Sequence, residues 1–219
     1  MKLSKRLSNI LNIIKYKTLA DIGTDHAYLP IKACEQGIID MAIATDINKG
    51  PLEIAVANIK KAKLEHKINI RHGNGLDVIQ PNEADTIIIA GMGGVLIWDI
   101  IQNGLNIAKE TKQLILSPQH NIENLRKNLI AGGFNITNEI VIQEGLKFYI
   151  IIECNWANEY HIYTDKEYFL GKYKKGSWRA FFKSEYTRIQ KYIEKNKQDI
   201  IKLQWINEEM SKECQVFFQ

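Results

Sequence analysis

The chain has 219 residues, of which 45% are hydrophobic, and its 29 basic and 25 acidic residues give a formal net charge of +4. Its three cysteines, Cys34, Cys154 and Cys214, are far apart, which argues against a disulfide framework or a zinc knuckle and fits a reducing compartment. Because the chain carries no long apolar run and no signal-like start, we expect a soluble, cytoplasmic protein without membrane contact.

Apolar residues predict strands and helices that alternate over the first part of the chain. An opening helix is expected within residues 2–15, where Leu3, Leu7 and Ile10 have helical spacing. The predicted strands are 18–22, 41–46, 68–72, 86–90 and 113–117, and the helices between them are 27–36, 51–63, 94–102 and 122–131. Alternation at this interval predicts right-handed crossovers and a mostly parallel sheet in an α/β fold.

The pattern changes twice towards the carboxyl end. Residues 135–143 and 147–154 flank a Glu144-Gly145 turn and predict a terminal hairpin that adds one antiparallel strand to the sheet. Beyond residue 158, helical spacing predicts a coiled-coil-like α-helical hairpin, which divides the chain into domains 1–157 and 158–219. The expected seam of that hairpin is Phe182, Tyr186, Ile189, Ile193, Asn196, Ile200, Leu203, Asn207 and Met210.

The first predicted strand ends in Asp21-Ile22-Gly23, where a glycine lets the backbone approach a ligand closely. An ordinary strand-to-helix turn is the alternative interpretation. The glycines of a dinucleotide-binding G-x-G-x-x-G motif are missing, and Asp25 would repel a pyrophosphate. The turn therefore favours a cationic ligand.

Polar residues follow the next two strands. Asp46 stands about twenty residues after the first turn, where a carboxylate can bind both hydroxyls of a ribose; the alternative is the N-cap of the following helix. Asn74, between Gly73 and Gly75, can read the edge of an adenine, although a plain glycine-rich turn is equally compatible with the pattern.

The fourth and fifth strands also end in distinctive loops. An apolar strand runs into Ala90-Gly91-Met92-Gly93-Gly94, a loop almost bare of side chains, and no Gly-Lys-Ser/Thr follows it to make a phosphate loop. After the fifth strand, Gln119 and Asn121 are candidates for contact with a base edge, and His120 either faces a ligand or is structural.

Two classes of chemistry are not favoured. The five histidines show no H-x-x-x-H spacing and the cysteines no C-x-x-C spacing, so we expect no metal site. The sequence also lacks the G-x-S-x-G turn of many hydrolases.

Basic residues crowd the carboxyl-terminal stretch, with eleven against four acidic residues between 166 and 202. Tyr168, Phe169, Tyr173 and Trp178 are interleaved with them, a combination that suits phosphate contact and base stacking. A solvated helical face is the alternative. The candidates for RNA contact, which include an amino-terminal pair, are Lys5, Arg6, Lys172, Lys174, Lys175, Arg179 and Lys183.

These motifs together resemble the bacterial tRNA (adenine-22-N1)-methyltransferases. That family carries Leu-Ser-Lys-Arg-Leu, found here at 3–7, Asp-Ile-Gly-(Ser/Thr)-Asp-His-Ala-Tyr-Leu-Pro, found at 21–30, and Ala-Gly-Met-Gly-Gly, found at 90–94. The resemblance extends over about the first 155 residues, whereas residues beyond it are similar only as a basic helical hairpin. The predicted terminal hairpin agrees, because Rossmann-like methyltransferase sheets end in this way.

The resemblance implies S-adenosyl-L-methionine as the methyl donor and N1 of an adenine in a tRNA D-loop as the acceptor. The implied cofactor-binding residues are Asp21, Gly23, His26, Asp46, Asn74, Gly75, Ala90, Gly91, Met92 and Gly93. One residue departs from the family pattern, because an Asp is expected where this chain has Asn74.

The acceptor atom directs the choice of catalytic candidates. Unpaired adenine N1 has a free lone pair, so the enzyme mainly aligns it with the sulfonium methyl and stabilises the cationic product. The candidates are Asp25, Asn121 and Tyr149, and tRNA is the expected partner of a monomer. A methyltransferase for a small molecule or protein, and a non-catalytic RNA-binding module, are the alternatives.

Overall fold

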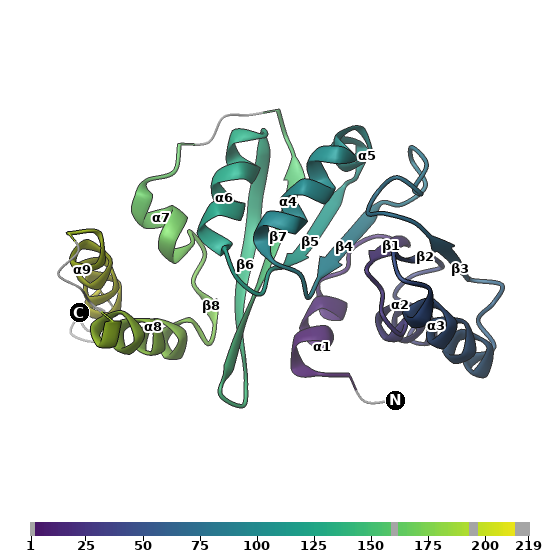
Figure 1. Cartoon of the computed structure of the whole chain (residues 1–219), viewed down its shortest axis with the longest axis horizontal. Helices are drawn as coiled ribbons and strands as arrows, with labels where there is room; N and C mark the ends of the chain where they lie inside the picture. Colours follow the sequence, from purple (N-terminus) through teal and green to yellow (C-terminus); the bar gives the residue numbers. More distant parts are fainter. Residues whose placement is uncertain (1–2, 159–161, 193–196, 213–219) are drawn as a thin grey trace.

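The computed structural model describes residues 3–158, 162–192 and 197–212, so Cys214 lies outside the described residues. Its centre is a sheet in the order β3-β2-β1-β4-β5-β7-β6-β8, with helices on both faces (Figure 1). The strands are β1 Thr18–Ile22, β2 Met41–Asp46, β3 Ile68–His72, β4 Thr86–Ala90, β5 Gln113–Ser117, β6 Phe134–Glu144, β7 Lys147–Trp156 and β8 Lys175–Gly176. The first five are parallel and have the predicted bounds.

The terminal hairpin is confirmed. β7 pairs antiparallel with both β5 and β6, so one strand runs against the rest of the sheet. The two-residue β8 then pairs parallel with β6 at the edge. β8 was not predicted, because two residues are too few to show strand periodicity.

The helices are α1 Lys5–Asn12, α2 Tyr28–Glu35, α3 Lys49–Ala62, α4 Gly94–Asn103, α5 Leu105–Glu110, α6 Ile122–Ala131, α7 Asp165–Leu170, α8 Trp178–Tyr192 and α9 Lys197–Ser211. The opening helix begins at a true N-cap, because the Ser4 hydroxyl accepts a hydrogen bond from the Leu7 N–H at 3.2 Å. The six-residue helices α5 and α7 were not predicted, since each is shorter than two helical turns.

Two hydrophobic clusters cover the two faces of the sheet. Along β4, Ile87 and Ile89 point into the cluster that includes α4, α5 and α6, whereas Ile88 points into the cluster that includes α1, α2 and α3. All three side chains are fully buried. A parallel strand that is covered on both faces needs apolar residues at every position, which explains the unbroken isoleucine run.

The strand order places a crevice at the carboxyl ends of β1 and β4. From β1 the chain proceeds to β2 and β3 on one side, and β4 and β5 lie on the other. Adjacent strands whose connections leave in opposite directions form the topological switch point at which α/β sheets bind ligands. The loops after β1 and β4 therefore border the place where a ligand is expected.

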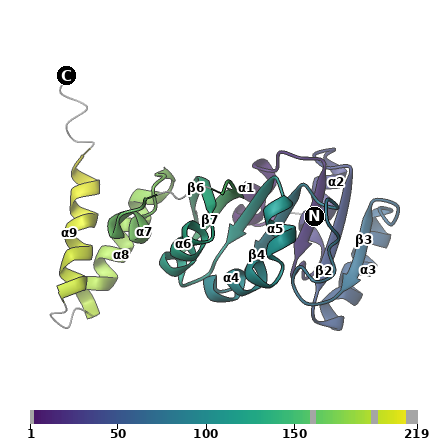
Figure 2. The same ribbon diagram turned by 90° about the horizontal axis from the view of Figure 1, so that it is seen from above.

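The carboxyl-terminal helices lie at the end of the molecule remote from β3 and α3 (Figures 1 and 2). Tyr163 is buried in the same cluster as the sheet, and Trp178 and Phe181 pack against that cluster. The second unit therefore has extensive contact with the first, and the boundary at residue 157 stays a prediction.

The predicted helical hairpin is present as α8 and α9, but its buried face in α9 differs from the expected seam. Ile206 is fully buried and Asn207 is exposed, whereas Ile200 is 44% exposed. The reason is that α9 packs on α7 as well as on α8, and the rings of Phe169 and Trp205 lie 6.3 Å apart. The buried face of α9 is therefore rotated relative to the face that would contact α8 alone. Ile193 and Asn196 of the seam lie outside the described residues.

Candidate active site

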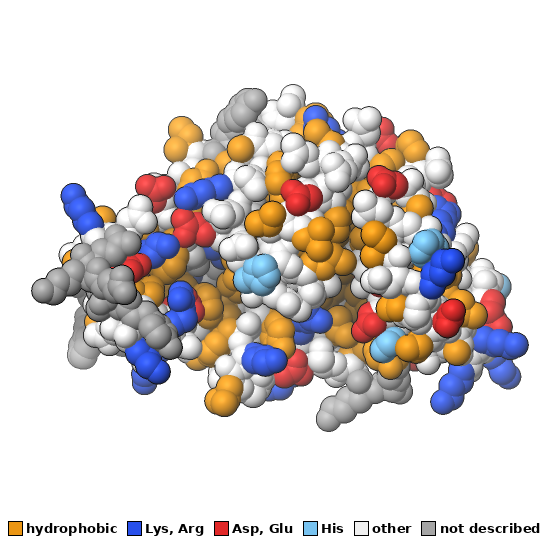
Figure 3. All heavy atoms as spheres, in the orientation of Figure 1, with side chains coloured by type: hydrophobic (Ala, Val, Ile, Leu, Met, Phe, Trp, Pro, Cys, Tyr) orange, Lys and Arg blue, Asp and Glu red, His pale blue; other side chains and the backbone are white. Residues whose placement is uncertain are grey.

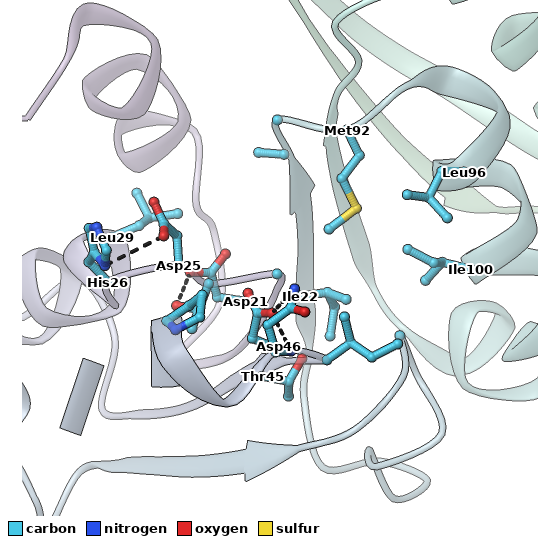
Figure 4. Close-up of a pocket in the computed structure, with 18 of the residues that line it drawn as sticks. Asp21, Ile22, Asp25, His26, Leu29, Thr45, Asp46, Met92, Leu96 and Ile100 are labelled. Carbon is cyan, nitrogen blue, oxygen red and sulfur yellow. Dashed lines mark hydrogen bonds and ion pairs between the residues drawn. The ribbon is translucent and has the colours of Figure 1, made fainter. Parts of the chain in front are cut away.

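A cavity of about 650 Å³ opens at the carboxyl ends of the parallel strands. Its walls come from the turn after β1, the end of β2, the loop after β3 and the loop after β4. Figure 4 shows Asp21, Asp25 and Asp46 on one side and Met92 with Ile100 on the other. An acidic wall therefore faces an apolar one.

The turn after β1 is held by two hydrogen bonds of one residue. The Thr24 hydroxyl donates to Asp21 Oδ2 at 2.7 Å, and the Thr24 N–H donates to the Thr45 carbonyl oxygen at 2.8 Å. Gly23, Asp25 and Ala27 all have φ between 56° and 70°, in the left-handed region. Only glycine adopts this region without cost, so the turn stores strain that these hydrogen bonds hold in place. Thr24 and Thr45 were not singled out from the sequence.

The buried carboxylate of Asp21 has an altered acidity. Burial raises its pKa to about 6; the Thr24 hydrogen bond opposes this rise, Asp46 and Asp25 add to it, and Arg6 reduces it. The negative form is disfavoured in the empty turn, and a cation beside it would favour that form. Asp21 is thus suited to a positively charged ligand.

Asp46 closes the acidic wall at the end of β2. Its Oδ1 accepts hydrogen bonds from the Asn48 N–H at 2.8 Å and from Asn48 Nδ2 at 3.3 Å. Within the described part of the chain, its Oδ2 has no donor and lines the cavity. The N-cap of α3 is Asn48, so the alternative role of Asp46 as helix cap does not apply.

The loop after β3 contributes the third side of the cavity. Asn74 and Gly75 line it, together with the exposed Ile47 at the end of β2. Leu96 and Ile100 of α4 also line the cavity (Figure 4), and a Cβ placed on Gly75 would lie 3.0 Å from Ile100 Cγ2. A flat ring would find apolar contacts here and an amide at its edge.

The loop after β4 is close to the turn after β1. A Cβ placed on Gly23 would lie 2.2 Å from Met92 Cε, so the methionine side chain extends over that glycine. Ala90 and Gly91 line the cavity as well. Gly93 does not, because it packs against the ring of His120 instead, where a Cβ would approach His120 Cε1 to 2.4 Å.

The three catalytic candidates lie in different places. Asp25 is at the rim of the cavity with its side chain 69% exposed, and its Oδ1 lies 3.5 Å from His26 Nδ1. Tyr149 does not line the cavity; its ring lies beneath the guanidinium of Arg6. Asn121 lines a second cavity, of about 640 Å³.

Gln119 connects the two cavities. It lines both of them, and its N–H donates to the Met92 carbonyl oxygen at 2.8 Å. The second cavity lies between the α6 side of the sheet and the carboxyl-terminal helices, with Phe148 and Phe181 among its apolar residues and Arg188 and Lys202 among its charged ones. The sequence suggested Gln119 as a base contact without placing it at this junction.

The candidates for RNA contact divide by exposure. Exposed side chains belong to Lys5, Lys172, Lys175, Arg179 and Lys183. Lys174 is half-buried, and its ammonium group donates to the Gly171 carbonyl oxygen. Arg6 is also half-buried and lines the first cavity. On the face in Figure 3, Lys and Arg gather over the carboxyl-terminal helices and around α3 more than over α4.

S-adenosyl-L-methionine fits the residues that line the first cavity. Thr45 Oγ1 is buried in its wall without a hydrogen-bond partner among the described residues, and Asp46 Oδ2 is available beside it. The ligand carries hydroxyls and cationic groups that such acceptors bind. Across residues 3–158, 162–192 and 197–212 there is no helix long and apolar enough to cross a bilayer and no group of side chains suited to a metal ion.

The sequence profile of a family described as a methyltransferase domain matches residues 3–152. Together with the sheet and the cavity, this match defines a Rossmann-like methyltransferase that uses S-adenosyl-L-methionine. A curated tRNA (adenine(22)-N(1))-methyltransferase of Bacillus subtilis is 38% identical over 153 residues, which are 69% of this chain and 64% of the relative.

Solved structures match over nearly the whole chain. The B. subtilis M1A22 tRNA methyltransferase has a TM-score of 0.76 at 31% identity, over 95% of this chain and 96% of that one. A Streptococcus pneumoniae protein in complex with S-adenosyl-L-methionine has a TM-score of 0.88 at 31% identity, over 94% of this chain and 99% of that one. The chain belongs to the tRNA (adenine(22)-N1)-methyltransferase family.

Proposed function

We propose that this protein methylates N1 of adenine 22 in the D-loop of tRNA, with S-adenosyl-L-methionine as the donor. The observation that carries the proposal is the cavity at the switch point of the sheet, with its acidic wall and its apolar wall. The name of the B. subtilis relative supports the acceptor atom, and the ligand of the S. pneumoniae structure supports the donor.

The donor site follows from the cavity walls. Asp46 Oδ2 accepts hydrogen bonds from the ribose hydroxyls, and Asn74 contacts the edge of the adenine between Ile47 and Leu96. Asp21 takes its ionised form beside the cationic groups. When bound, S-adenosyl-L-methionine supplies a methyl group on a positively charged sulfur. The backbones of Gly23 and Gly91 line the cavity beside it, and the Met92 side chain extends over Gly23.

The acceptor needs alignment rather than deprotonation. Adenine N1 carries a free lone pair once the base is unpaired, so the protein has only to hold N1 in line with the methyl group. Asp25, at the rim, accepts a hydrogen bond from the exocyclic amine and stabilises the cationic product base. Gln119 guides the base from the second cavity into the first, and Asn121 contacts the approaching strand.

The carboxyl-terminal unit, residues 158–219, holds the tRNA. Its exposed cations, including Lys172, Lys175, Arg179 and Lys183, suit the phosphate backbone. We take a monomer as the working unit. We place the enzyme in the cytoplasm, where its tRNA substrate is found.

The test uses two transcripts of one bacterial tRNA that differ only in A or G at position 22. The purified protein is incubated with each and with S-adenosyl-L-methionine carrying a tritiated methyl group. We expect label in the A transcript alone and a reverse-transcriptase stop at that nucleotide, because a methyl on N1 blocks base pairing. Label in both transcripts, or transfer only to a small molecule or protein, would contradict the proposal. No transfer to either transcript, together with no donor binding in calorimetry, would mark a non-catalytic RNA-binding module instead.

A further inference from the structure

The second cavity, of about 640 Å³, has the opposite charge balance from the first. Three cationic side chains and two carboxylates line it, whereas one cation and three carboxylates line the first cavity. Arg126 is paired with the buried Glu139. The Glu123 carboxylate, by contrast, is shared by the ammonium groups of Lys127 at 2.8 Å and Lys202 at 3.1 Å. The second cavity therefore suits an anionic ligand.

Aromatic rings form the apolar part of the second cavity. Phe148 of β7 and Phe181 of α8 line it with their ring centroids 5.7 Å apart, and both side chains are only half-buried. Phe169 of α7 lines it as well, and the Lys202 ammonium lies 4.6 Å from the centroid of that ring. Aromatic rings beside cations suit single-stranded nucleic acid, because bases stack on the rings and phosphates contact the cations.

Two polar side chains in this cavity have groups left for a ligand. Asn121 is the N-cap of α6 with a φ of +57° and makes no side-chain cap hydrogen bond, so its amide can contact the edge of a base. Arg188 Nε and Nη2 donate to Glu185 at 3.1 Å and 2.7 Å, which holds the guanidinium in place. Its Nη1 has no acceptor in the described part of the chain and suits a phosphate oxygen.

One strand separates the two cavities. Successive side chains of a strand point to opposite faces, so in β7 Phe148 lines the second cavity, whereas Tyr149 packs under Arg6 of the first. Gln119 lines both cavities next to the glycine loop after β4, because a Cβ on Gly91 would lie 3.9 Å from Gln119 Nε2. Two consecutive nucleotides of an unpaired strand can therefore lie on either side of Gln119.

We propose that the second cavity binds the nucleotide next to the target adenine, with its base against Phe148 and Phe181 and its phosphate at Arg188. Binding of this neighbour holds the target base in the first cavity, because the RNA backbone connects the two nucleotides. The inference rests on the proposed function and adds to it a second nucleotide-binding site, formed jointly by the sheet and the carboxyl-terminal helices.

The experiment combines enzyme variants with altered tRNA transcripts. Two transcripts each lack one base, immediately 5′ or 3′ of the target adenine, and a third lacks a base in the anticodon loop. Phe181→Leu keeps an apolar side chain but removes the ring, and it should lower kcat/KM for unaltered tRNA roughly 5- to 150-fold, the range for a base stacked on an aromatic ring. On one of the two neighbouring abasic transcripts the same variant should cause no further loss, because the stacked base is already missing. On the anticodon-loop transcript the full loss should persist.

Matched variants separate this result from a structural effect. Tyr186→Leu removes a ring on the same helix that packs between α8 and α9, and it should leave kcat/KM unchanged. Phe181→Leu should bind S-adenosylhomocysteine as the unaltered protein does in calorimetry, because Phe181 is not part of the first cavity. Arg188→Gln should reduce the salt dependence of tRNA binding by about one counterion.

Three outcomes would contradict the inference. An equal loss from Phe181→Leu on every transcript would show that the ring contacts no neighbouring base, and weaker S-adenosylhomocysteine binding would show a structural effect. Unchanged tRNA methylation in both Phe181→Leu and Arg188→Gln would overturn the inference and leave the proposed function intact. If the unaltered protein methylated no tRNA, the proposed function itself would fail.

Discussion

Arg126 and Glu139 form an ion pair in which both side chains are almost completely buried, with 2.7 Å between Arg126 Nε and Glu139 Oε1. The other polar atoms of this pair reach the carboxyl-terminal unit. Arg126 Nη1 donates to the carbonyl oxygens of Tyr168 at 2.8 Å and Phe169 at 3.0 Å, and Glu139 Oε2 accepts from the Lys172 N–H at 3.0 Å. The pair therefore joins the sheet to α7 and to the segment after it.

Glu139→Ala leaves the Arg126 charge buried without its partner. We expect a loss of about 3–5 kcal/mol in the free energy of unfolding, measured by urea denaturation, because an uncompensated buried charge is costly. Glu185→Ala breaks the exposed pair with Arg188 and serves as the control, with a loss below about 1 kcal/mol. Equal losses in the two variants would show that the buried pair has no special role.

Gly171 provides a second test of the same junction. Its φ is +80°, and a Cβ there would lie 2.7 Å from Glu139 Oε2 and 2.9 Å from Arg126 Nη2. Gly171→Ala should therefore lower the melting temperature clearly more than Gly145→Ala, which has a φ of +61° and no atom near its Cβ. A larger effect of Gly145→Ala would contradict this description of the junction.

Asp21 predicts a particular pH dependence of stability. Its pKa is about 6 in the fold and 3.8 in the unfolded reference, so the folded protein holds this proton more tightly. Stability from this group is fully present below pH 3.8 and is lost as the pH rises to about 6. The Asp21→Asn variant has no group that titrates at this position and so does not lose this stability. Its free energy of unfolding minus that of the unaltered protein should therefore rise by about 3 kcal/mol across that window.

Urea denaturation of both proteins at several pH values measures that difference. Any fixed effect of the amide, such as an unpaired donor, is constant with pH and does not affect the slope. A difference that stayed flat between acidic and neutral pH would show that the carboxylate ionises normally in the fold.

Asp46 and Asp40 offer a matched pair at the two ends of β2. Asp46 ends the strand in the cavity wall, whereas Asp40 is exposed immediately before the strand begins. Asp46→Ala should weaken S-adenosylhomocysteine binding by about 1–3 kcal/mol in calorimetry, because two ribose hydroxyls lose their acceptor. Asp40→Ala should have no effect, and an equal loss there would exclude a direct role for Asp46.

Lys183 and Lys174 test the RNA-contact candidates. Lys183 is exposed on α8, whereas the Lys174 ammonium already donates to a carbonyl oxygen and burial lowers its pKa. Lys183→Gln should weaken tRNA binding and reduce the dependence of the binding constant on salt by about one counterion, as a filter assay at several salt concentrations measures. Lys174→Gln should leave that salt dependence unchanged.

Much of the fold was predictable because residues close together in the sequence determine most of its strands and helices. The five parallel strands have their expected bounds, since each has apolar residues at successive or alternate positions and is followed by a polar or glycine-rich turn. The cavity could also be anticipated, because parallel strand ends meet at one edge and bring Asp21, Asp46 and Asn74 together. Gly93 is the exception, since its contact with His120 depends on the neighbouring loop.

The sequence by itself determined the order of the elements and the chemistry of the loops, because periodicity and turn residues act between near neighbours. Only the tertiary structure decided that Arg6 enters the cavity above Tyr149, that α9 buries Ile206 instead of Asn207, and that a buried ion pair fastens α7 to the sheet. These contacts join segments distant along the chain. Their partners are selected by the packing of whole elements, which no local pattern records.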